Sequence, residues 1–280
     1  DFCLSRGLGD VYKRQDCGQL LFIFEKLCDA VAYAHAKGVI HRDLKPGNIM
    51  VGAFGVVTVM DWGLAKVLGE PDLLEPLLLA ETGQDLDSTG PDSDESPVVD
   101  AHLQTQVGTI FGTPAYIAPE QARGEIDRVD KPSDVFGLGS ILCKILTGTP
   151  PYTGAKFKEI YAKACQGDLA EAFERLDAST APADMINLAK KCLSPEPADR
   201  PASAVEVARM TMQYLQSEQR RAERDLVRFF DLSPDLFCIA SLAGYFQRVN
   251  ENFSRVLGYT DDELTSRPFL DYVHPDDRVK

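Results

Sequence analysis

The chain has 280 residues, 44% of them apolar and 26% charged, which allows a sizeable core and argues against wholesale disorder. Its net charge of −14 argues against a general nucleic-acid binder and against a protein that adheres to anionic membranes. The seven cysteines form no C-x-x-C pair, and no apolar run reaches the roughly 20 residues of a membrane span. These features predict a cytoplasmic protein with reduced, mostly buried thiols and no membrane segment in this stretch.

Residues 1–18 precede the first recognisable element. They show no apolar periodicity up to residue 15 and end in a run that looks like translated linker sequence, so we interpret them as a non-native or residual segment. A native loop is the alternative. Residues 19–37 then predict a helix with one apolar face, formed by Leu20, Phe24, Leu27, Val31 and Ala34 and followed by the stop signal Gly38.

The strongest chemical pattern follows this helix. Residues 41–48 read His-Arg-Asp-Leu-Lys-Pro-Gly-Asn, and the run Asp-Trp-Gly at 61–63 comes after two β-rich runs, 49–51 and 56–60, which predict a hairpin. An acid, a lysine and a carboxamide within six positions, followed by a second acid, can hold metal-bound phosphates beside a hydroxyl group. Each residue alone would be an ordinary loop residue, so the combination carries the prediction.

Residues 41–48 fit the H-R-D-L-x-x-x-N catalytic loop of protein kinases at every fixed position, and the chain resembles the bacterial branch of the eukaryotic-type Ser/Thr kinases. Residues 112–120 are similar to the end of an activation segment, 134–139 to the start of the buried central helix, and 199–201 to the late arginine motif. The resemblance covers roughly residues 19–215. It implies an α+β fold, in which a mainly helical large lobe carries short β-hairpins, with further helices at 156–165, 183–193 and 202–215.

The resemblance also implies a role for each residue of the two blocks. Asp43 orients the attacking hydroxyl of a protein substrate, and Lys45 neutralises charge on the transferring phosphoryl group of ATP. Asn48 and Asp61 bind Mg²⁺ and, with Lys45, hold the nucleotide phosphates. The dipeptide formed by Lys45 and Pro46 is typical of Ser/Thr rather than Tyr kinases.

Six further residues are expected to support this site by resemblance. His41 packs beneath the loop and is not catalytic, Asp134 holds the loop's backbone, and Thr113 places its hydroxyl near Asp43. Glu120 and Arg200 form a buried pair that clamps the activation segment. Arg42, the sixth residue, is expected to pair with a phosphate on the activation loop. The candidate sites for that phosphate are Thr105 and Thr109. Trp62 replaces the usual phenylalanine of D-F-G.

An acidic insert separates the hairpin from the end of the activation segment. Residues 69–105 are longer than an activation segment requires, rich in acids, and free of lysine and arginine. One sign of charge and low apolar content predict a disordered loop there.

Residues 205–229 extend the last kinase helix past its expected end at residue 217. A three-four alternation runs through Val205, Ala208, Met212, Leu215, Gln219, Ala222, Leu226 and Phe229. This seam predicts either a coiled coil that forms a homodimer or a single helix in which 218–229 are a linker, and both interpretations stay open.

Residues 230–280 differ again in composition. Two β-like runs, 238–242 and 245–249, meet at Gly244, and residues 274–277 read His-Pro-Asp-Asp. Their order resembles the first half of a PAS sensor domain, which implies a truncated, partly α/β PAS module. No ligand can be argued for it.

No glycine-rich loop and no V-A-I-K-type lysine occur before residue 19, although kinases use both to cover ATP. We therefore expect an internal fragment that is inactive alone and comes from a Ser/Thr kinase coupled to a PAS module. The alternatives are a kinase-like scaffold without phosphotransfer, and a multi-domain PAS sensor with another output.

Overall fold

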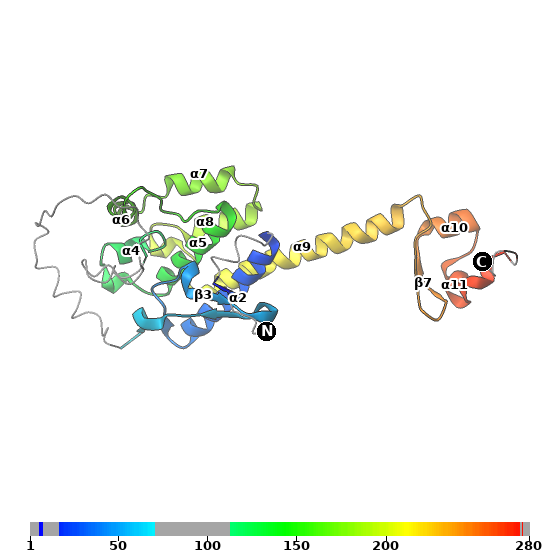
Figure 1. Cartoon of the computed structure of the whole chain (residues 1–280), viewed down its shortest axis with the longest axis horizontal. Helices are drawn as coiled ribbons and strands as arrows, with labels where there is room; N and C mark the ends of the chain where they lie inside the picture. The colour runs from blue at the N-terminus through cyan, green and yellow to red at the C-terminus, as the bar shows by residue number, and fades with distance from the viewer. Residues whose placement is uncertain (1–5, 8–16, 71–112, 275, 277–280) are drawn as a thin grey trace, which may run out of the picture. The chain divides into compact units, whose positions relative to one another are not determined.

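The computed structural model describes residues 6–7, 17–70, 113–274 and 276 (Figure 1). The chain divides into two compact units, residues 1–215 and 216–280. The helices of the first unit are α2 (Cys17–Ala36), α4 (Pro119–Ala122), α5 (Lys131–Thr147), α6 (Phe157–Gln166), α7 (Ala170–Ala178) and α8 (Ala183–Cys192). A long helix, α9 (Ala204–Leu232), begins in the first unit and ends in the second. The division at residue 215 falls close to the expected end of the large lobe.

Helix α5 is the centre of the first unit and packs against α8 and α2. Its apolar residues point in every direction, as expected of a helix with no solvent face. Val135, Leu138 and Ile141 are fully buried, and Gly139, in the middle of α5, lets the helix backbone approach Cys192 at the end of α8. The predicted buried helix is therefore confirmed, and it gives the catalytic segments a rigid floor.

The strands of the first unit are short and antiparallel. Strand β3 (Ile49–Val51) pairs with both β4 (Val57–Val59) and β1 (Arg6–Gly7), and β2 (Val39–Ile40) pairs with β5 (Lys66–Val67). The predicted hairpin is confirmed as β3 and β4, with Ile49 opposite Val59. Because one strand begins after residue 48 and the other ends before residue 61, the hairpin brings the two catalytic blocks to the same end.

Two differences from the predicted helices have simple causes. Helix α7 was not predicted, because it is a strongly charged nine-residue segment of which only Ala172 and Leu176 are buried. The predicted helix at 202–215 and its extension to 229 are one element, α9, which continues to Leu232. The remaining helical pieces are short 3-10 turns, namely Pro46–Asn48, Ala53–Gly55, Trp62–Leu64, Ile126–Arg128, Pro197–Asp199 and Phe269–Tyr272.

The second unit is small. It pairs β6 (Cys238–Ala240) with β7 (Phe246–Val249) in an antiparallel hairpin and adds α10 (Glu251–Leu257) and α11 (Asp261–Ser266). Val249, Phe253 and Leu264 form its core. The first turn of α11 is stabilised by a capping box, in which Thr260 and Glu263 each satisfy the other's backbone N–H.

Several predictions fall on residues outside the described ranges. The insert that was predicted to be disordered lies almost wholly there, as do Thr105 and Thr109, and only residues 69 and 70 of the insert are described. Residues 6, 7, 17 and 18 are the described part of the segment set aside as non-native. Residues 6 and 7 pair with β3, and residues 17 and 18 open α2, while the origin of the segment stays a prediction. Among the described helices, none combines the length and the apolar character that crossing a membrane requires.

Candidate active site

The carboxylate of Asp43 is held by three hydrogen-bond donors in a nearly buried position. Its Oδ2 accepts from Lys45 Nζ at 2.7 Å and from Asn48 Nδ2 at 3.0 Å, while Oδ1 accepts from the backbone N–H of Thr113 at 3.3 Å. Only 8% of Asp43 is exposed. Thr113 therefore lies beside Asp43 as expected, but the contact runs through its backbone rather than its hydroxyl. The result is a fixed carboxylate with a cation next to it.

Asn48 and Asp61 end the two sides of the hairpin. The carbonyl of Asn48 accepts from Met60 N at 2.8 Å, so Asp61 is one residue beyond the position paired with Asn48. The Asn48 amide nitrogen donates to both Oδ2 and the backbone carbonyl of Asp43, and in the described part of the chain no hydrogen bond occupies its Oδ1. Asp61 is exposed. A carboxamide oxygen and an exposed carboxylate are thus adjacent at one end of the hairpin.

Backbone strain marks the same two blocks. Among the described residues, only Arg42 and Asp61 combine a side chain with positive φ, at 67° and 60°. A left-handed conformation costs a residue with a Cβ roughly 1–2 kcal/mol, and such residues cluster at functional sites where the surroundings fix them. Arg42 directly precedes Asp43, and its Nε donates to the carbonyl of Leu64 at 2.5 Å.

His41 lies beneath the catalytic loop and is fully buried. Its Nδ1 accepts from Asp43 N at 3.2 Å, which leaves Nε2 to donate to the carbonyl of Met60 at 3.0 Å. Trp62 packs its ring edge-to-face against the imidazole, with 4.6 Å between ring centroids, and donates from Nε1 to Val59. The substituted aromatic residue therefore keeps a packing role against His41. The imidazole links the loop to the hairpin.

Asp134, at the start of α5, holds the loop's backbone from inside. Its carboxylate accepts from the backbone N–H groups of His41 and Arg42, both at 2.8 Å. The sequence interpretation missed two further contacts. Gln121 donates from Nε2 to the carbonyl of Arg42, and His35 lies 2.9 Å from Asp134 Oδ2. His35 had a signal in the sequence, since it is a polar residue on the apolar face of its helix.

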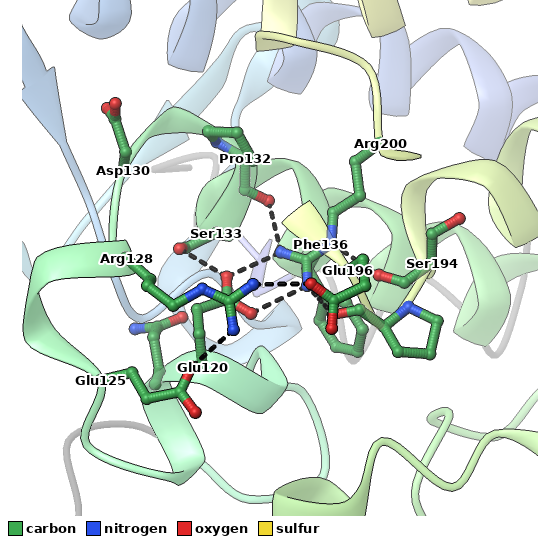
Figure 2. A network of polar contacts seen from close by, with 12 residues as sticks. Glu120, Glu125, Arg128, Asp130, Pro132, Ser133, Phe136, Ser194, Glu196 and Arg200 are labelled. Carbon is green, nitrogen blue, oxygen red and sulfur yellow. Dashed lines mark hydrogen bonds and ion pairs between the residues drawn. The ribbon is translucent and has the colours of Figure 1, made fainter. Parts of the chain in front are cut away.

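Glu120 and Arg200 form a fully buried ion pair with two parallel hydrogen bonds of 2.7 and 2.8 Å (Figure 2). Ser133 donates to the same carboxylate, and the guanidinium lies over the ring of Phe136, 5.0 Å from its centroid. The remaining Arg200 donors reach the backbone carbonyls of Pro132, Ser194 and Pro195. The pair fastens the end of the activation segment to α5 and to the segment before α9.

The turn that carries Thr113 is attached to α5. Tyr116 N–H donates to the carbonyl of Thr113, and the Tyr116 carbonyl accepts from Ser140 Oγ on α5. Burial raises the pKa of Tyr116 to about 12, so its hydroxyl stays neutral at physiological pH. The segment that faces Asp43 is therefore attached to α5 through the backbone of Tyr116, in addition to the Glu120–Arg200 pair.

This arrangement suits phosphoryl transfer, which depends on positioning and charge neutralisation more than on covalent chemistry by the protein. Asp43 can accept a hydrogen bond from an incoming hydroxyl, and Lys45 places a positive charge beside it. The oxygens of Asn48 and Asp61 are the hard ligands that Mg²⁺ prefers, so the donor set fits a phosphate-bound magnesium ion.

Comparison with known families identifies both units. The protein kinase domain profile matches residues 5–85 and 92–215, and a PAS fold profile matches residues 246–280. The kinase match includes both catalytic blocks and the Glu120–Arg200 pair. Its first residue lies within the segment set aside as non-native.

Curated relatives carry kinase names. The chain is 31% identical over 223 residues to the serine/threonine-protein kinase PknD of Protochlamydia amoebophila, which covers 80% of this chain and 20% of that protein. It is 38% identical over 152 residues to PknD of Chlamydia abortus, covering 54% and 15%. It is 33% identical over 180 residues to PknB of Mycobacterium tuberculosis, covering 64% and 24%. The chain thus spans a quarter or less of the length of each of these relatives.

Proposed function

The chain belongs to the protein kinase family, and on that basis we propose that the protein carrying it transfers the γ-phosphoryl group of ATP to serine or threonine hydroxyls of a protein substrate. The observation that carries the proposal is the Asp43 carboxylate, fixed by Lys45, Asn48 and Thr113 beside the oxygen donors at the end of the hairpin. The net charge of −14 favours protein over nucleic acid as the substrate.

Each residue has a defined task in this reaction. Asp43 accepts the hydrogen bond of the substrate hydroxyl and aligns its oxygen with the phosphorus. Lys45 offsets the negative charge of the transferring group, and Asn48 and Asp61 hold Mg²⁺. When bound, the ion would neutralise phosphate charge, and the positive-φ backbone of Asp61 would set the position of one of its ligands.

Replacement of Asp43 tests the proposal. We expect Asp43→Asn, in the whole protein that carries this chain, to lower kcat about 10²- to 10⁴-fold, because the amide cannot accept the proton and its NH₂ group faces donors. The assay follows phosphate transfer from labelled ATP to a panel of Ser/Thr peptides. Asp127→Asn, which neutralises an exposed acid outside the site, is the control. Equal turnover in both variants would contradict the role of Asp43, and absence of transfer by the original protein would leave the kinase-like scaffold as the better explanation.

We also propose that the second unit is a sensory PAS module whose state regulates the kinase, and that the kinase unit works in the cytoplasm. The profile match at residues 246–280 and the α9 helix that joins the two units support this coupling. Excision of residues 230–280 from the whole protein tests this coupling. If the PAS module regulates the kinase, peptide phosphorylation should rise or fall. If the protein is a multi-domain sensor with another output, peptide phosphorylation should stay unchanged.

Phosphorylation of Thr105 or Thr109 is a further proposal for the activation segment. A phosphothreonine adds about −1.5 to −2 charge and is a strong partner for arginine, and Arg42 stands directly before Asp43. We expect mass spectrometry of the active whole protein to find phosphate on one of the two threonines. Full activity of the Thr105→Ala/Thr109→Ala variant would contradict this.

A homodimer through α9 remains a proposal as well. Leu226 and Phe229 are 68% and 65% exposed, as seam residues of a coiled coil would be before pairing. Ala208, by contrast, is buried in the core of the first unit, which shortens the seam available to a partner. The oligomeric state is therefore expected to depend on the later part of the helix.

A further inference from the structure

His35 connects two distant parts of the kinase unit through the two nitrogens of one ring. It lies in the last turn of α2 and is only 2% exposed. Its Nδ1 accepts from the backbone N–H of Ala204, the first residue of α9, at 3.4 Å. Its Nε2 lies 2.9 Å from Oδ2 of Asp134. Since a backbone N–H can only donate, Nδ1 carries no proton, and Nε2 must donate its proton to Asp134.

The carboxylate that receives this proton also holds the catalytic loop. Oδ2 of Asp134 is shared between His35 and the backbone N–H of His41, and Oδ1 accepts from the N–H of Arg42. The two backbone donors belong to the loop itself. His35 supplies a donor from another element, which fixes the rotation of the carboxylate independently of the loop.

The loop needs such a fixed anchor because part of it is strained. Arg42 has φ of 67°, a conformation that persists only where the surroundings determine it. An anchor that could rotate would let Arg42 relax and would displace Asp43, the next residue. A displacement of about 1 Å from a productive position can cost about 100-fold in rate.

The contact with Ala204 serves a second purpose. The first N–H groups of a helix have no partner within the helix. Ala204 is fully buried, so its N–H requires a partner from the protein, and His35 Nδ1 provides it. Because α9 is also the helix that continues into the second unit, the position of its first turn and the anchor of the catalytic loop depend on the same imidazole.

We infer that His35 is a positioning residue: it locks the Asp134 carboxylate that shapes the catalytic loop and ties that anchor to the first turn of α9. The inference rests on the proposed kinase function for its rate effect, but the hydrogen-bond relay itself is independent of activity. His35 does not touch the reacting groups. Its effect should appear in kcat and in the protection of the loop's amides rather than in the KM values.

Two conservative variants separate the halves of the relay. Asparagine places its polar atoms near the position of Nδ1, so His35→Asn keeps an acceptor for Ala204 and loses the donor to Asp134. Glutamine reaches the position of Nε2, so His35→Gln keeps the donor to Asp134. His35→Leu removes both. Thr211→Val is the matched control, because Thr211 is buried on α9 and donates only within its own helix, to the carbonyl of Val207.

Two measurements test the inference. In the whole protein we expect His35→Asn and His35→Leu to lower kcat about 10- to 100-fold with both KM values nearly unchanged. In the 280-residue chain we expect the same two variants to accelerate hydrogen exchange of the His41 and Arg42 amides about tenfold. His35→Gln should stay within about threefold of the original protein in both kcat and exchange rate. Thr211→Val should match the original protein.

Distinct results would overturn the inference. His35→Asn with the original kcat and exchange rates would show that the Asp134 contact is dispensable. Equal impairment of His35→Gln and His35→Leu, with equal losses in thermal stability, would show that the ring acts by packing alone. If the whole protein transferred no phosphate, the proposed function would fail, while the exchange experiment on the chain would still decide the relay. If His35→Leu did not fold, the comparison of asparagine with glutamine would suffice.

Discussion

At the scale of single residues, the structure contains ion pairs of the same chemistry in two environments. The side chains of Glu120 and Arg200 are fully buried and share two hydrogen bonds, and every other donor of the guanidinium reaches a backbone carbonyl. Glu125 and Arg128 are a surface pair on the neighbouring turn, where hydrogen bonding to Arg123 lowers the pKa of Glu125 (Figure 2). Burial, rather than distance, decides how much each pair stabilises the fold.

Neutralising the fully buried acid should therefore be far more damaging than neutralising the half-buried one at the surface. We expect Glu120→Gln to lower the free energy of unfolding by about 3–5 kcal/mol, because Arg200 is left as a buried charge without its counterion. Glu125→Gln removes a partner from a surface pair and should cost less than about 1 kcal/mol. Urea unfolding of the chain, followed by far-UV circular dichroism, measures both. Similar losses in the two variants would contradict the assignment of Glu120 and Arg200 as the clamp.

At the scale of elements, the sequence predicted those whose own residues specify them. Helix α5 was predicted because its apolar residues surround the helix, and the hairpin because two β-rich runs flank a glycine-containing turn. Helix α7 was not predicted, since its few apolar residues form no clear periodic pattern and the helix is stabilised by packing against α5 and α8. The hydrogen bond from the Thr113 backbone N–H to Asp43 was not predicted, because sequence indicates neighbours but not which group faces them.

The crossing of α5 and α8 depends on the missing side chain of Gly139. A Cβ there would lie 2.6 Å from Cys192 Cβ and 3.2 Å from its backbone carbonyl carbon. Alanine is favoured over glycine in a helix by about 1 kcal/mol, but overpacking in a core costs about 1–3 kcal/mol, so Gly139→Ala should be destabilising or at best neutral. Gly47→Ala, where a Cβ meets open space, is the control for urea unfolding. A gain in stability for Gly139→Ala would show that α8 can shift away.

At the scale of the whole molecule, four ordered motifs were enough to predict the kinase unit, and the second unit followed from the order of short runs around Gly244. The relay through His35 could not be predicted in this way. His35 and Ala204 are far apart in the sequence, and neither carries a motif. The sequence does not show that the end of α2 lies beside the start of α9, because the packing of the core determines which helix ends meet.

The exposed seam of α9 provides the last test at this scale. Ala208 is buried in its own unit and Leu215 packs partly against the same core, so the free seam covers at most about two heptads, fewer than the three to four of a stable coiled coil. We therefore expect light scattering of the chain to show a molar mass that rises toward the dimer only with concentration. Leu226→Glu should abolish that rise by placing a charge in the seam, whereas Ser217→Glu, on the opposite face of the helix and with the same charge change, should not. A monomer mass at every concentration would refute the dimer, and α9 would then act within a single chain.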